Sequence, residues 1–323
     1  MAIMGSRTKY KVTMHDIHLA IKLRSLDNVR EVMLRDLTLD VNQSLFGSTA
    51  LSLSLYYNCN EAFDLLLHRH IQTSTVDLDK LSYDPQKRLE PALVTAVRLG
   101  NKAAMVQLLD CGANIEVTDG FGHTALWTAA RERRFSIAVT LLCRGATVRP
   151  STRSASLPVF TATRLTSRRT DLSQLLILAG ADDYSHDGPS LLGRMLAPGR
   201  YSVIHLLLSA CHVSAPWPWR HGSQITHIPA THDTVIDNLL QEYFLQPASL
   251  QTQCRWTIRR VIGHAMRGRY FLSALSQLPL PQSLLDYLSL VDVLAEDELA
   301  TDSWITGDWM QLIKYMISEQ SQR

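Results

Sequence analysis

The chain has 323 residues, enough for two domains or for one elongated array with an appendage. Apolar residues make up 46% and charged residues 19%, and a net charge of +2 does not favour nucleic-acid binding by the chain as a whole. The sequence has no apolar run of about 18 residues and no signal-peptide pattern, so we expect neither a membrane span nor secretion.

The first two thirds of the chain is periodic. Leu93 and Leu126 are 33 residues apart, and so are Ala96 and Ala129. The alanine phase continues at Ala162, and weaker copies fall on Ala20, Ser54 and Met195. Apolar pairs follow each of these positions, at Val32-Met33, Leu66-Leu67, Leu108-Leu109, Leu141-Leu142, Leu176-Ile177 and Leu207-Leu208.

Each period predicts a pair of helices. A Thr-x-Leu start caps the first helix, the leucine pair ends the second, and a glycine such as Gly112, Gly145 or Gly180 closes it in a left-handed conformation. Neither helix buries its apolar face alone, so neighbouring pairs stack. The pattern resembles the ankyrin repeat, most closely in Thr124 to Ala130. The resemblance implies an all-α solenoid of about six repeats over residues 13–212, with an insertion near 72–88.

Repeats four and five are rich in arginine. Between Gly120 and Arg169 we count nine arginines and one acid, Glu132. Two clusters should be neighbours in the array and are candidates for binding an acidic target: Arg131, Arg133, Arg134, Arg164, Arg168 and Arg169. The alternative is a solvated face with cations near helix C-termini. Aromatic residues for base stacking are scarce here, which speaks against RNA or DNA.

Residues 213–243 differ from the array. Pro216-Trp217-Pro218-Trp219 and Pro229 interrupt helices and predict a linker. The two tryptophans either plug the end of the array or anchor a partner. A short amphipathic helix is expected from Val235 to Leu245.

Two short motifs follow, in residues 244–290. Leu250, Cys254 and Ile258 are spaced i, i+4, i+8 and form one apolar stripe of a helix that Ser249 caps. Downstream, Leu278-Pro279-Leu280-Pro281 cannot continue a helix, and we expect a rigid, extended apolar segment. A helix stripe followed by a stiff apolar strip favours docking over catalysis.

This segment resembles a SOCS box, through Ser249-Leu250, Cys254-Arg255, Ile258-Arg259, Ile262-Gly263, Leu275, Leu278 to Pro281, Leu284 and Tyr287-Leu288. The resemblance implies that Leu250, Cys254 and Ile258 bind elongin C of the elongin B/elongin C pair. It also implies that Leu278, Pro279, Leu280 and Pro281 contact a cullin, usually cullin-5, with its RING subunit. Leu285 departs from the family pattern, which has a basic residue there.

The last segment, residues 291–323, extends beyond the usual end of such a box. Glu296, Asp297, Glu298 and Asp302 make it acidic, and an amphipathic helix is expected from Trp309 to Ile317. That helix either packs on its own domain or binds a partner.

Other chemistry finds little support. Gly120 to Ala125 matches Gly-x-Gly-x-x-Ala, but no strand or βαβ unit accompanies it. Cys211, His212, His221, His227 and His232 fit no structural zinc spacing, and no cofactor or metal is predicted. The five cysteines show no Cys-x-x-Cys pair and an odd total, so we interpret them as free, buried thiols of a reducing compartment.

The sequence is thus identified as similar to the ankyrin repeat and SOCS box family. The implied role is a non-catalytic substrate receptor of a cullin–RING ubiquitin ligase, in the cytoplasm and with the nucleus left open. One alternative is an ankyrin scaffold whose box is only a packing element. The other is a nucleic-acid-binding array, which steep salt dependence of binding would support.

Overall fold

A computed structural model describes residues 13–25, 30, 40–73, 76–148, 158–164, 171–181, 191–196, 200–213, 220–221, 224–225, 228, 230–231, 233–267, 269 and 272–297. Contacts divide the chain into two compact units, residues 1–125 and 126–323. The division falls inside the predicted array, and each unit is described by itself. None of the described helices is both long and apolar enough to cross a membrane.

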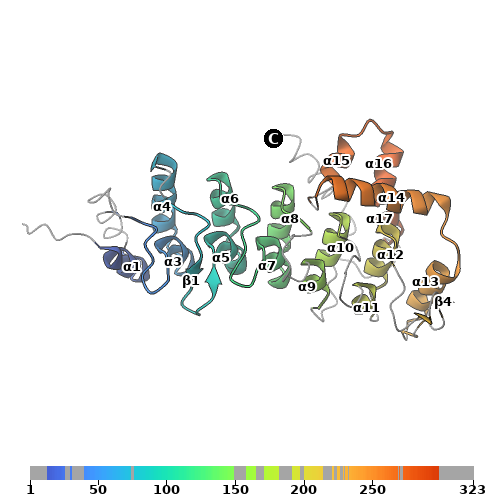
Figure 1. The fold of residues 1–323 in the computed structure, drawn as a ribbon, viewed down its shortest axis with the longest axis horizontal. Coiled ribbons are helices and arrows are strands. Elements are labelled where there is room, and N and C mark those ends of the chain that lie inside the picture. Colours follow the sequence, from blue (N-terminus) through green and yellow to red (C-terminus); the bar gives the residue numbers. More distant parts are fainter. Residues whose placement is uncertain are drawn as a thin grey trace, which may run out of the picture. The chain divides into compact units, whose positions relative to one another are not determined.

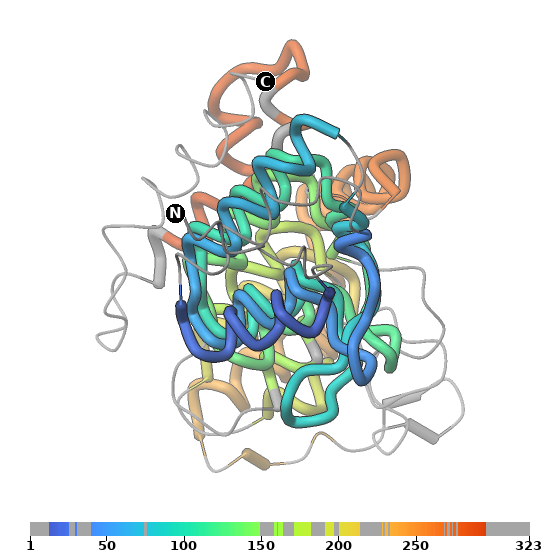
Figure 2. The backbone as a smooth tube through the Cα atoms, turned by 90° about the vertical axis from the view of Figure 1, so that its left-hand side faces the viewer, coloured from blue at the N-terminus to red at the C-terminus, as the bar shows by residue number. Residues whose placement is uncertain are grey.

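The first unit is built of short helices: α1 (Met14–Lys22), α3 (Ala50–Tyr56), α4 (Asn60–Thr73), α5 (Ala92–Leu99) and α6 (Lys102–Asp110). Helices α3 and α4 pack as a pair, and so do α5 and α6. The leading helices α1, α3 and α5 pack on one another in that order, and Figures 1 and 2 show them one behind another. Two of the predicted helix pairs, α3 with α4 and α5 with α6, are therefore present, whereas the second helix of the first predicted pair lies outside the described residues.

The ends of these helices follow the predicted capping rules. The side chain of Thr49 accepts a hydrogen bond from the Ser52 amide at 3.3 Å, and that of Asn101 accepts one from Ala104 at 3.0 Å. After α6, Gly112 has a φ of 93°, the left-handed conformation that closes a helix. Leu66, Leu93 and Leu108 are almost fully buried between the helices, so the apolar phase of the sequence forms the core.

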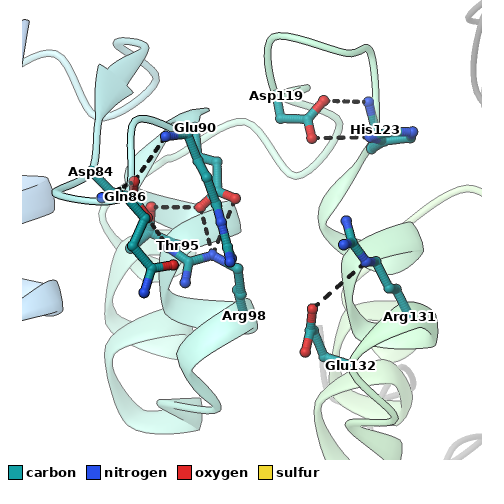
Figure 3. A network of polar contacts seen from close by, with 10 residues as sticks. Asp84, Gln86, Glu90, Thr95, Arg98, Asp119, His123, Arg131 and Glu132 are labelled. Carbon is teal, nitrogen blue, oxygen red and sulfur yellow. Dashed lines mark hydrogen bonds and ion pairs between the residues drawn. The ribbon is translucent and has the colours of Figure 1, made fainter.

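The insertion before α5 contains an antiparallel hairpin of β1 (Ser82–Tyr83) and β2 (Leu89–Glu90). Buried ionic contacts fix it to α5 (Figure 3). The Arg98 guanidinium donates to Asp84 at 2.9 Å and to Glu90 at 2.8 Å, and Asp84 also accepts from the backbone amides of Gln86 and Arg88. These carboxylates are satisfied from several sides, as buried charges must be.

The second unit continues the alternation of short helices: α7 (Ala125–Arg131), which begins at the last residue of the first unit, α8 (Phe135–Cys143), α9 (Pro158–Arg164), α10 (Asp171–Leu178), α11 (Leu191–Met195) and α12 (Tyr201–Ala210). The predicted apolar pairs lie on α8, α10 and α12 and are buried. Helix α10 packs on α8, α9 and α12. Gly145 and Gly180 have φ values of 91° and 105°, as predicted.

The described residues are mostly helical, consistent with the all-α prediction, but two hairpins were missed. The second, β3 (Arg220–His221) with β4 (Gln224–Ile225), lies in the segment predicted to be a linker. Such two-residue strands leave almost no periodic signal. Several predicted features lie outside the described residues: Val32-Met33, Arg168, Arg169, Trp217, Trp219, His227, His232 and the helix from Trp309 to Ile317.

A pH dependence follows from α1, where the side chain of His18 is 7% exposed. Burial lowers the pKa of His18 to about 4, below its usual 6.5. The unfolded chain therefore binds the proton more readily, so this contribution to stability is present above pH 6.5 and is lost as the pH falls toward 4. We expect the urea midpoint of the protein to fall over this window.

The variant His18→Leu should flatten that fall, whereas His15→Gln, at an exposed position of the same helix, should leave most of it. An equal pH dependence of the urea midpoint in the parent protein and in His18→Leu would show that His18 is not the titrating group.

Candidate protein-docking site

The segment after the helix pairs forms two helices, α13 (Thr234–Leu245) and α14 (Leu250–Ala265). The Asp233 side chain caps α13 by accepting from the amides of Val235 and Ile236, and Ser249 caps α14 by accepting from Thr252 at 3.1 Å. Pro247 separates them, because a proline does not continue a helix. Both predicted helices, and the predicted cap Ser249, are confirmed.

Helix α14 buries a charged residue at the centre of its inner face. Arg259 is 7% exposed, and its guanidinium donates to the carbonyl of Leu288 at 2.6 Å and to that of Ile177 at 3.1 Å. Burial lowers its pKa to about 9, so it stays protonated at neutral pH. Arg259 thereby ties α14 to the end of α10 and to α16 (Gln282–Leu288), and α14 lies across α10 and α12 (Figure 1).

Arg255, one turn earlier, is buried in the same way. It forms an ion pair with Asp292, and its guanidinium carbon lies 3.5 Å from the centre of the Tyr287 ring. Beside it, the indole Nε1 of Trp256 donates to the Leu208 carbonyl of α12 at 3.0 Å. Arg255, Trp256 and Arg259 thus orient α14. This anchoring role was not predicted from the sequence, although the i, i+4 spacing of the two arginines was a usable signal.

The opposite face of α14 is apolar and exposed. Leu250 is 77% exposed and Ile258 39%, and Cys254 between them is also exposed. Val261, 58% exposed, extends the stripe by three residues and was missed by the prediction. The prediction of uniformly buried thiols was wrong. Cys254 is exposed, because the arginine face of the helix, and not its apolar face, packs on the unit, and Cys111 and Cys211 are only half-buried. We call Leu250, Cys254, Ile258 and Val261 the α14 stripe.

The Leu-Pro-Leu-Pro motif lies between α15 (Leu272–Ser276) and α16. It interrupts the helix as predicted, but it is not simply extended. The Leu280 amide donates to the Leu278 carbonyl at 2.8 Å, which closes a three-residue turn around Pro279. Pro281 then occupies the N-cap of α16. Leu278, Pro279 and Pro281 are exposed and Leu280 is half-buried, so the motif presents a compact apolar knob.

A cavity of about 430 Å³ adjoins the start of α14, between α12, α13 and α14. Tyr243, Trp256, Ser249 and Thr252 contribute to its wall. The rings of Tyr243 and Trp256 lie 5.6 Å apart at their centres, and the Tyr243 hydroxyl accepts from the Val213 amide at 2.8 Å. These contacts hold α13 and α14 against α12.

The predicted tail contains a helix that was not expected, α17 (Val291–Asp297). Val293 and Leu294 are buried, and α17 packs on α12 and α16. Residues 291–297 therefore belong to the packed unit. They supply Asp292, the partner of Arg255, and so help to orient the α14 stripe.

The arginines of the first predicted target-binding cluster surround the turn between α7 and α8. Arg131, Arg133 and Arg134 are exposed. The guanidinium carbon of Arg131 lies 5.6 Å from the centre of the Trp127 ring, and its Nε lies 3.9 Å from Oε1 of Glu132. Arg164 ends α9, but its side chain lies outside the description, as do Arg168 and Arg169. That the two arginine clusters lie next to each other therefore stays a prediction.

Comparison with known proteins identifies the segment. A family model, the SOCS box, matches residues 246–289, which contain α14, α15 and α16. No curated protein matches the chain. A SOCS box implies an adaptor role in a ubiquitin ligase, because such boxes bind elongin B/C and a cullin. Proteins with this box are typically substrate-recognition adaptors and not catalysts.

The contacts of Arg259 predict how the box is held. In Arg259→Met the side-chain volume is largely kept, but the carbonyls of Leu288 and Ile177 lose their donor. We expect the unit to lose about 2 kcal/mol of stability. Chemical denaturation and protease sensitivity between α13 and α17 measure the loss.

The matched control is Arg260→Met, because Arg260 is the neighbouring arginine and is exposed. It should leave both readouts unchanged. Equal loss in the two variants would contradict the anchoring role of Arg259.

Proposed function

We propose that the protein is the substrate-recognition adaptor of an elongin B/C–cullin–RING ubiquitin ligase. The α14 stripe binds elongin C, and Leu278 to Pro281 contact cullin-5. The helix pairs form an ankyrin-repeat array that holds the target protein. Ubiquitin transfer is then a matter of proximity, because the adaptor raises the effective concentration of the target's lysines near the charged E2 enzyme.

The observation that carries the proposal is the orientation of α14. A helix packed for stability alone buries its apolar face and leaves arginines in water. Here Arg255 and Arg259 are buried and the α14 stripe is exposed. Exposed apolar side chains in a continuous row are typical of a surface that a partner covers, and this row lies within the segment that matches the SOCS box.

The position of the Leu-Pro-Leu-Pro motif supports two separate contacts. The motif precedes α16, whereas the stripe runs along α14, and α14 packs on α16. The Arg259 bond to Leu288 fixes α16 relative to α14. One partner at the stripe and another at the motif would thus be held at a fixed spacing by the same small core.

The array assignment rests on the helix pairs and on the 33-residue phase. Three of the described pairs, those that end in α6, α8 and α10, are closed by left-handed glycines, and most residues of the leucine pairs are buried, as ankyrin repeats would have them. The exposed Arg131, Arg133 and Arg134 remain candidates for contact with an acidic target. Stacked pairs of this kind present loops and turns to a partner without building a catalytic cleft.

The stripe gives the first test of the proposal. In Leu250→Asp with Cys254→Asp, two carboxylates replace apolar side chains that the partner would desolvate. We expect capture of purified elongin B/C to fall at least about 100-fold, with unchanged thermal stability of the adaptor. Val261→Asp alone should also weaken capture. Intact capture by the double variant would refute the proposed contact.

The control places two carboxylates on the exposed surface of α14 to one side of the stripe, as Gln253→Asp with Arg260→Asp. It should bind elongin B/C like the parent chain. If the control and the stripe variant lose binding equally, added charge on the helix and not the stripe is responsible.

The proline motif gives the second test. Pro279→Ala with Pro281→Ala loosens the turn by giving both residues more backbone freedom. We expect cullin-5 binding by the elongin-loaded adaptor to weaken about tenfold, and elongin B/C binding to stay unchanged. Titration of each partner in turn measures the two affinities. Equal loss of both would mean that the two contacts are not separable.

A further inference from the structure

A turn in the first unit places an aromatic residue where backbone geometry disfavours one. Leu45 and Ser48 exchange two backbone hydrogen bonds, at 2.9 and 3.0 Å, so Phe46 and Gly47 are the central pair of a two-residue turn. Their φ values are 53° and 79°. Such turns favour Asn-Gly or Asp-Gly, because a bulky residue at positive φ is strained.

Phe46 is also 91% exposed, so its ring adds nothing to the core. Phe46 is therefore unfavourable in two ways: its backbone is held at a positive φ, and its apolar ring is exposed to water. Strain and exposure at one aromatic position are better explained by a contact with another molecule than by folding.

Backbone hydrogen bonds connect this turn to two further loops of the same unit. The Tyr83 amide of β1 donates to the Gly47 carbonyl at 2.9 Å, β1 pairs with β2, and the Gly120 amide of the next turn donates to the Leu89 carbonyl of β2 at 2.8 Å. Neighbouring segments joined in this way lie about 5 Å apart. The turn at Phe46, the hairpin and the turn at Phe121 therefore form one continuous row, which we call the loop row.

The loop row exposes aromatic and basic side chains. Phe121 is 73% exposed and Tyr83 44%, and Lys87 and Arg88 are exposed at the hairpin tip. Two rings at the ends and one between them give an extended segment of a partner several places for apolar side chains.

The acids of the loop row face inward. Asp84 and Glu90 are bound by Arg98 (Figure 3). Asp119 accepts from the amides of Phe121 and His123, each at 2.8 Å, and contacts the His123 ring at 3.0 Å. The carboxylates of the loop row are thus hydrogen-bonded within the fold, whereas the positive charges of Lys87 and Arg88 are exposed to solvent.

We infer that the loop row, through Phe46, Tyr83, Lys87, Arg88 and Phe121, binds an acidic peptide segment that contains aromatic or large aliphatic residues. The inference rests on the proposed function, since this segment would belong to the ubiquitination target. Aromatic and basic side chains also suit single-stranded nucleic acid, but tracking a phosphate backbone takes a groove of cations and not the two at one hairpin tip.

The test is a selection of random short peptides displayed on phage against the intact chain. Selected peptides should be rich in Asp and Glu together with Phe, Trp or Leu. Synthetic copies of these peptides should bind the double variant Phe46→Asn with Phe121→Ser at least about tenfold more weakly than they bind the parent chain. Lys87→Glu with Arg88→Glu should weaken them similarly and reduce the salt dependence of binding. Since asparagine accepts positive φ, Phe46→Asn should not lower the melting temperature.

The control is Leu23→Ser with Ile71→Ser, which removes exposed apolar side chains of the same unit outside the loop row. It should bind the selected peptides like the parent chain. Neutral or basic consensus peptides, binding that survives the Phe46 and Phe121 changes, a selection without binders, or tighter binding of oligo-dT than of the peptides would each overturn the inference.

Elongin B/C capture by the same preparations separates this inference from the proposed function. If the loop-row variants lose peptide binding but still capture elongin B/C, the result supports both this inference and the proposed function. Peptide binding by a parent chain that captures no elongin would leave the loop row as a docking surface and remove the ligase role.

Discussion

The burial of Arg255 and Arg259 is the constraint on which the docking site depends. Because their guanidinium groups reach a carboxylate, a ring face and two backbone carbonyls, α14 has one orientation against α10, α12, α16 and α17. Buried charges tolerate little displacement, since each lost contact leaves an unsatisfied group. The polar contacts fix the helix, and the apolar stripe is left facing outward.

The surfaces proposed to bind partners are built in different ways. The α14 stripe and the turn at Pro279 lie on a small core built from α14 to α17, at the end of the helix pairs. The loop row of the first unit is built instead on backbone hydrogen bonds between turns and a hairpin. Rigid helices supply the framework in both units, and the exposed groups that would meet a partner are carried by a helix face or by loops.

The sequence was sufficient to predict features that depend on local rules. Helix pairs, the cap Ser249, the left-handed glycines and the stripe spacing all follow from residues a few positions apart. It was not sufficient where the outcome depends on distant partners. Cys254 is exposed because Arg259 meets Ile177, and α17 packs on the unit through Val293 and Leu294 while its Asp292 meets Arg255. Neither contact is visible in local periodicity, and the three-residue turn at Pro279 depends equally on its surroundings.

The central claim, that a partner covers the α14 stripe, is tested most directly by the reactivity of Cys254. All five cysteines lie in the described part of the chain, and Cys254 is the exposed one, so peptide-level mass spectrometry after brief alkylation isolates its rate. We expect rapid labelling of Cys254 in the free protein and strong protection when purified elongin B/C is bound at saturation. Unchanged labelling of Cys254 in the saturated complex would contradict the account.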